Sequence, residues 1–271
     1  MASERQPPTA VLGLCDASLA GARVLLSHIL AAGPAESAGR WSVSWDDARD
    51  AGAREPTHVP PPAFALRAVG GGSAAPALAH VEGAMVSPAN GPPLALLAVN
   101  ADVPAGECVR RAAEVVDALL RLRADNAPPH VVILGALRFV PERGLASEVH
   151  VATASPARAR EPPALPRALL ALPALRADAQ LHDRFLATLV PLLLARGARV
   201  TLLAISSLGA GVGAGAGASV SDGGAPAASL AACLAALVGR PCALDARLVA
   251  QLESKRYTDA LVETTGFFLY T

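Results

Sequence analysis

The 271-residue sequence contains a single lysine, Lys255, and its other 22 basic residues are arginine. Acidic residues number 23, so the formal net charge is zero. Nucleic-acid-binding domains usually carry a basic excess, and none is present here, so we expect no nucleic-acid partner. The scarcity of Lys beside abundant Ala, Pro and Arg is typical of a GC-rich genome. The choice of arginine and the alanine runs therefore say little about function.

Cysteine is also scarce, and its four positions form no C-x-x-C pair: Cys15, Cys108, Cys233 and Cys242. The six histidines are scattered and show no H-E-x-x-H spacing. We therefore expect no metal and no cofactor, and reduced thiols in the cytoplasm.

Long hydrophobic runs are missing, because Arg or Pro interrupts each apolar stretch before the ~20 residues that a membrane span needs. Residues 1–8 lack the apolar core of a signal peptide. We therefore expect no membrane association. Hydrophobic residues make up 52% of the chain and charged residues 17%, which indicates a folded protein with a large core.

Short apolar runs alternate with segments of helical periodicity. The runs predict strands at 9–15, 63–69, 80–86, 94–99, 130–137 and 199–206. The periodic segments predict helices at 18–32, 105–124, 178–196, 230–238 and 245–256. The short turn between 80–86 and 94–99 favours a hairpin. The order of elements predicts one α/β domain of three layers, with a mainly parallel central sheet flanked by helices.

Two segments are predicted to lie outside the core. Residues 138–166 are polar and Pro-rich, which favours a surface excursion. Residues 209–228 form a low-complexity Gly/Ala loop, in which glycine at every odd position from 209 to 217 makes a dinucleotide-binding match accidental. We place the α/β domain at 1–257 and a flexible C-terminal tail at 258–271. Trp41 and Trp45 are expected to be a locally buried pair, with a partner-binding anchor as the alternative.

Catalysis would require a nucleophile with a base beside it. Ser18 follows the first predicted strand, and Ser206 and Ser207 lie at the end of the last one. No G-x-S-x-G motif is present. An α/β hydrolase or phosphorylase with an unrecognised site is therefore the alternative hypothesis.

The C-terminus is the most distinctive part of the sequence. Only 3% of all residues are aromatic, yet Phe267, Phe268 and Tyr270 fall within the last five positions. The last three residues, Leu269, Tyr270 and Thr271, read hydrophobic–Tyr–any. An apolar cleft can accept the leucine and phenol side chains, and a lysine or backbone amides can bind a terminal carboxylate. A C-terminal strand packed on the sheet edge would also explain the two phenylalanines.

This ending resembles that of the proteasome assembly chaperone 1 family, whose members use a hydrophobic–Tyr–any tail to dock on the proteasome core particle. The order of elements is similar as well, including VLGLCDASLAGARVLLSHIL, HVVILGAL, LPRALLAL and LHDRFLATLVPLLLARGARVTLLAI. The Gly/Ala segment at 209–228 and the Pro-rich tracts depart from the family pattern.

The resemblance implies a non-enzymatic chaperone for assembly of the proteasome core particle. Its expected partners are proteasome assembly chaperone 2, as a heterodimer, and the proteasome α subunits. Leu269, Tyr270 and Thr271, supported by Phe268, would bind a pocket of the α ring and promote ring formation. The expected location is the cytoplasm, with the nucleus and the endoplasmic-reticulum surface as further compartments.

Overall fold

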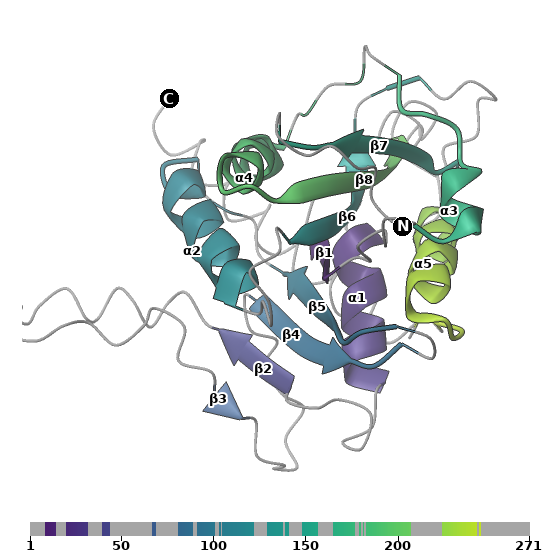
Figure 1. Cartoon of the computed structure of the whole chain (residues 1–271), viewed down its shortest axis with the longest axis horizontal. Helices are drawn as coiled ribbons and strands as arrows, with labels where there is room; N and C mark the ends of the chain where they lie inside the picture. The colour runs from purple at the N-terminus through teal and green to yellow at the C-terminus, as the bar shows by residue number, and fades with distance from the viewer. Residues whose placement is uncertain are drawn as a thin grey trace, which may run out of the picture.

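The computed structural model describes residues 9–14, 20–31, 40–43, 67–68, 81–88, 91–100, 103, 105–121, 129–137, 139–140, 148–156, 165–176, 179, 181, 183–206, 224–242 and 244. These residues form one mixed sheet with helices on both faces (Figure 1).

Eight strands make up the sheet within these ranges, in the order β3-β2-β4-β5-β1-β6-β8-β7. The strands are β1 (Ala10–Leu14), β2 (Arg40–Val43), β3 (Arg67–Ala68), β4 (Val81–Val86), β5 (Leu94–Val99), β6 (His130–Leu137), β7 (His150–Ala154) and β8 (Arg199–Ser206). The four central strands, β5, β1, β6 and β8, are mutually parallel. The strands outside them pair antiparallel, and β4 with β5 forms the predicted hairpin.

Five helices are described: α1 (Ala20–Ala31), α2 (Cys108–Arg121), α3 (Arg167–Leu170), α4 (Arg184–Ala195) and α5 (Gly224–Val238). Helices α1, α3 and α5 contribute to the core on one face of the sheet, and α2 and α4 to the core on the other (Figure 1). The three-layer α/β fold with a parallel centre is therefore confirmed. None of these described helices has the length and apolar character that crossing a bilayer requires.

Helix α1 lies against the middle of the sheet with almost no space between backbones. A Cβ atom on Gly21 would overlap the carbonyl oxygen of Leu134 in β6. A Cβ atom on Gly13 of β1 would overlap the carbonyl oxygen of Gly21. Two glycines thus allow α1 to approach β1 and β6 closely, and ten of its twelve residues are buried.

Helix α2 is amphipathic and buries six of its fourteen residues. The buried face runs through Ala112, Val115 and Leu119. Helical spacing from Ala112 would place Val109 on the buried face of α2. The Val109 side chain is instead 67% exposed, so the buried face is rotated relative to the one that the spacing predicts. Arg196, at the end of α4, lies 3.7 Å from the carboxylate of Asp117 and links the two helices of this layer.

The prediction of a surface excursion over 138–166 is wrong in part. Strand β7 lies within it and pairs antiparallel with β8 at the sheet edge. Val149 and His150 are buried there. The outer edge of β7 is covered in turn, because the backbone of Val151 pairs with Pro173 and Leu175. Strand β7 is determined by hydrogen bonds to residues that are distant in the sequence. The polar, Pro-rich residues around it give no local pattern that predicts a strand.

Three further boundaries differ from expectation. Helix α5 begins at Gly224, inside the segment predicted as a loop, and residues 209–223 lie outside the described ranges. Helix α4 begins after Asp183, whose side chain accepts a hydrogen bond of 2.6 Å from the Leu186 amide. This cap begins the helix later than periodicity alone predicts. Trp41 lies on strand β2, in register with Gly83; Trp45, the other member of the expected pair, lies outside the described residues.

Candidate functional site

The predicted tail site, Phe268, Leu269, Tyr270 and Thr271, lies outside the residues that the structure describes, as does the helix predicted at 245–256. Ser18 and Ser207 also lie outside them. Ser206 is therefore the predicted strand-end serine whose surroundings can be described. Two clusters of buried polar groups lie at opposite ends of β8, one around Ser206 and one around Arg199.

Ser206 ends β8 and is 2% exposed. Its hydroxyl donates a hydrogen bond to the backbone carbonyl oxygen of Phe139, which follows β6. A nucleophilic serine needs its proton directed toward a general base. A backbone carbonyl oxygen is not such a base, so this contact favours a structural role that ties β8 to the chain after β6.

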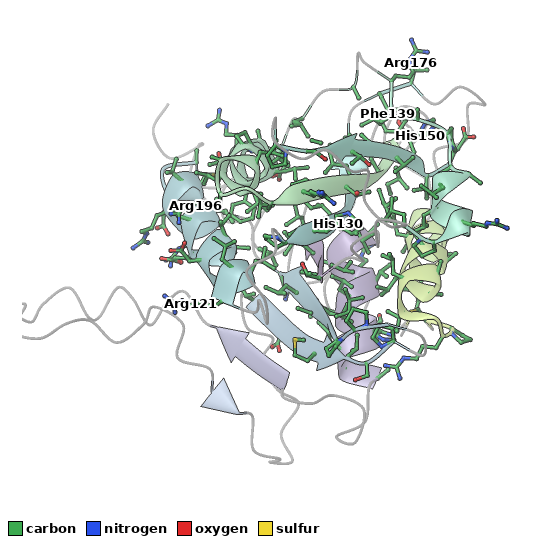
Figure 2. The ribbon with its side chains drawn as sticks, viewed as in Figure 1. Arg121, His130, Phe139, His150, Arg176 and Arg196 are labelled. Atoms are coloured by element: carbon green, nitrogen blue, oxygen red, sulfur yellow. The ribbon has the colours of Figure 1, made fainter. Side chains whose placement is uncertain are left out.

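His150 is a second polar residue at this end of β8, and it is fully buried. Its ring makes an edge contact with Phe139, with 4.8 Å between ring centroids, and Figure 2 shows the two beside β7. The Nδ1 atom lies 3.3 Å from the carbonyl oxygen of Ala174, and Nε2 lies 3.6 Å from a carboxylate oxygen of Glu148. The second distance exceeds that of a hydrogen bond. His150 thus joins β7 to the 173–175 segment that covers it.

The second cluster lies at the amino ends of β6 and β8. His130 begins β6 and pairs in register with Arg199, which begins β8. The Nε2 atom of His130 lies 2.9 Å from the hydroxyl of Thr201, which lies 3.5 Å from the hydroxyl of Thr153 in β7. The Thr9 hydroxyl bonds the backbone of His130 at 3.1 Å and fixes the chain that enters β1. In Figure 2, His130 lies inside the molecule at β6.

Burial, followed by the positive charge of Arg199, lowers the pKa of His130 from 6.5 to about 4. The imidazole is therefore neutral at pH 7. A neutral ring carries one proton, and the Thr153–Thr201 hydroxyl pair can donate to Nε2 and leave that proton on Nδ1. The cluster can therefore offer one imidazole N–H beside a guanidinium.

Metal-binding geometry is not found in the described ranges, where no group of three or more His, Cys, Asp or Glu side chains could hold an ion. Burial raises the pKa of the Cys233 and Cys242 thiols from 9.0 to about 11. Both thiols are therefore protonated at neutral pH, and the thiolate form that binds metals and attacks substrates is scarce.

Sequence reasoning located Ser206 but missed Glu148, His150 and the His130–Arg199 pair. The placement of His150 depends on Ala174 and Phe139, and none of these contacts follows a local spacing pattern. His130 offered a weak signal, because a polar residue opens a strand that is otherwise apolar and fully buried.

The fold and these clusters define a three-layer α/β domain whose parallel central strands have buried polar groups at both ends. No protein-family model and no curated protein matches the sequence.

Three solved structures show what the fold is similar to. PbaB of Pyrococcus furiosus, an archaeal proteasome activator, is 13% identical with a TM-score of 0.49, covering 97% of this chain and 96% of that one. PbaA of the same organism, an archaeal homolog of proteasome-assembly chaperone, is 13% identical with a TM-score of 0.46, covering 94% and 91%. A proteasome-assembly chaperone homologue of Mycobacterium tuberculosis is 18% identical with a TM-score of 0.41, covering 94% of each chain. Homologues of proteasome-assembly chaperones are thus among the structures similar to this chain.

Proposed function

We propose that this protein is a non-enzymatic chaperone that promotes assembly of the proteasome core particle. The observation that carries the proposal is the C-terminal sequence Leu269-Tyr270-Thr271, preceded by Phe268. The similar solved structures are named as an archaeal proteasome activator and two homologues of proteasome-assembly chaperones, and these names agree with the proposed role.

The chemistry of the tail suits a pocket between neighbouring α subunits. The Leu269 side chain and the Tyr270 ring bury apolar surface, and the phenol hydroxyl keeps a polar end for a hydrogen bond. The proposal takes Thr271 as the last residue, so that its carboxylate pairs with a lysine or with backbone amides of the pocket. Binding of this kind requires a free, extended tail and no catalytic group.

The folded domain acts, in this proposal, as half of a heterodimer with proteasome assembly chaperone 2 on the outer face of the forming α ring. Activators that insert the same kind of tail would be excluded while this chain is bound, because two tails cannot occupy one pocket. The proposed location is the cytoplasm, with the nucleus and the endoplasmic-reticulum surface as further sites.

The test is affinity purification from the protein's own cells, followed by mass spectrometry. The tag is placed at the N-terminus so that the carboxylate of Thr271 stays free. We expect proteasome α subunits and a second chaperone to copurify with the unaltered chain. A chain lacking residues 269–271 is expected to lose the α subunits and keep the chaperone partner.

Matched variants separate the parts of the tail. Tyr270→Phe removes only the hydroxyl and should weaken α-subunit recovery, whereas Tyr270→Ala should abolish it. Phe267→Leu serves as a control outside the motif. Recovery of no α subunit from any version contradicts the proposal. Loss of folding on deletion of 269–271, seen by circular dichroism, would show instead that the tail is part of the core.

A further inference from the structure

The amino ends of β6 and β8 hold a positive charge that no described carboxylate balances. Arg199 is 8% exposed, and within the described ranges no acidic side chain lies within ion-pair distance of it. Its Nε atom is buried without a hydrogen-bond partner in that part of the chain. Burial of a guanidinium is costly unless an anion or hydrogen-bond acceptors compensate it.

His130 provides a second unsatisfied group next to this charge. Its Nδ1 atom is also buried without a hydrogen-bond partner among the described residues, and the side chain has no exposed surface. His130 and Arg199 are register partners on adjacent parallel strands, so their side chains lie on the same face of the sheet. This is the face of α1, because Val132 and Leu203, two positions and four positions further along, belong to that core.

The hydroxyl chain can set which ring nitrogen of His130 carries the proton. Thr153 and Thr201 can donate in sequence toward Nε2, since the two distances are 3.5 Å and 2.9 Å. When the hydroxyls donate in this order, the ring proton lies on Nδ1, which is then a donor. Burial and the charge of Arg199 keep the His130 ring neutral. The site therefore has the positive charge of Arg199, and the imidazole adds no second positive charge.

We propose that Arg199 and His130 form a binding site for a small oxyanion, a carboxylate or a phosphate, at the amino ends of β6 and β8. The guanidinium supplies the charge and a planar pair of N–H donors, which matches the oxygens of either group. The imidazole Nδ1–H supplies a further donor from the neighbouring strand.

The test is thermal unfolding of the purified full chain in sodium phosphate, sodium acetate or sodium chloride at constant ionic strength. A ligand that binds only the folded state raises Tm with saturation, and we expect a rise of about 3–8 °C at 10 to 100 times the dissociation constant. A response to acetate alone identifies a carboxylate site, and a response to phosphate alone identifies a phosphate site. Equal Tm values in all three salts would overturn the proposal.

Variants distinguish this site from general salt effects, because phosphate also stabilises proteins by exclusion from their surface. Arg199→Met should abolish the saturating rise, whereas Arg196→Met should retain it. Arg196 is a suitable control because its side chain is 57% exposed and it lies 3.7 Å from Asp117. A saturating rise that survives in Arg199→Met contradicts the proposal.

A second measurement does not depend on the folding of the variant. Nitrogen-15 NMR of the unaltered chain reports the two imidazole nitrogens of His130 separately. Titration with phosphate or acetate should shift the Nδ1 resonance and leave Nε2, which faces Thr201, nearly unchanged. An unmoved Nδ1 resonance at anion concentrations that raise Tm would refute the site.

Discussion

The two helical layers cover the same sheet in different ways. Helix α1 buries ten of twelve residues and contacts the sheet through glycine and backbone atoms. Helix α2 buries six of fourteen, and its outward side carries charged side chains. Helix α1 therefore leaves no space for an additional atom at Gly13 and Gly21, whereas the layer of α2 and α4 should tolerate changes on its outer surface. Four predictions test this difference.

The largest effect is expected for Gly21→Ala. The added methyl group would overlap the carbonyl oxygen of Leu134, which belongs to the central sheet and cannot move easily. Overpacking of this kind costs about 3 kcal/mol, which corresponds to a fall in Tm of about 6–10 °C. Differential scanning calorimetry measures it. Gly106→Ala is the matched control, because no atom lies within 4 Å of a Cβ built there. Equal Tm values for both variants would refute the close contact.

The next effect concerns pH and the face that α1 covers. The pKa of His130 falls from 6.5 to about 4 on folding, so the unfolded chain binds a proton that the folded chain does not between these values. The free energy of unfolding is therefore fully retained above pH 6.5 and declines as the pH falls toward 4. The expected loss is about 3 kcal/mol.

Urea unfolding across this pH range measures the loss. His130→Asn removes the titrating group, so its free energy of unfolding should depend less steeply on pH than that of the unaltered chain. Parallel pH profiles for the two proteins would show that His130 is not a buried neutral group.

A smaller effect is expected for Asp183→Ala in the α4 layer. The Asp183 carboxylate accepts the Leu186 amide at 2.6 Å and caps the first turn of α4. Loss of such a cap costs about 1 kcal/mol, which urea unfolding resolves. Asp183→Ser keeps an acceptor and should retain most of the stability. If serine and alanine destabilise the protein equally, the cap is not the cause.

The smallest effect is expected for Glu107→Gln at the start of α2. Glu107 pairs with Arg110 at 2.9 Å and Arg111 at 3.0 Å, and these hydrogen bonds lower the pKa of its carboxyl group. Arg111 keeps Glu114 as a partner in the variant. Because the pair with Arg110 is exposed and the buried Arg111 retains Glu114, Tm should change by about 1 °C or less. A fall in Tm comparable to that of Gly21→Ala would erase the contrast between the two layers.

The sequence was most informative where local pattern and tertiary environment agree. β6 and β8 have the predicted bounds, because continuous apolar runs such as His130–Leu137 are typical of strands buried on both faces. Strand β7 was missed because it is short and lies in a polar, Pro-rich segment, and because its pairing partners, Val200 to Ala204, lie about fifty positions away. Local periodicity in a single sequence does not show which distant segments pair as strands.

In the candidate sites, single residues could likewise be identified from the sequence, but their partners could not. A serine at a strand end was identifiable as Ser206, but its partner, the Phe139 carbonyl, lies 67 positions away. The charge on Arg199 was visible, whereas its burial beside His130 follows only from the parallel register of β6 and β8. Contacts between backbones, such as Gly13 with Gly21, likewise need coordinates, although glycine in a buried strand is a signal worth noting.

The position of β1 has a consequence for synthesis on the ribosome. Ala10 is paired on one side with Ala95 and on the other with Val131. Strand β1 therefore leaves the ribosome before the other described strands and waits longest for both of its neighbours, so its apolar residues need protection until Leu137 has emerged. Contacts this distant in sequence slow folding and prolong exposure of hydrophobic surface. Nascent chains that stop before β6 should accordingly be captured by general chaperones, and chains extended past β8 should be released.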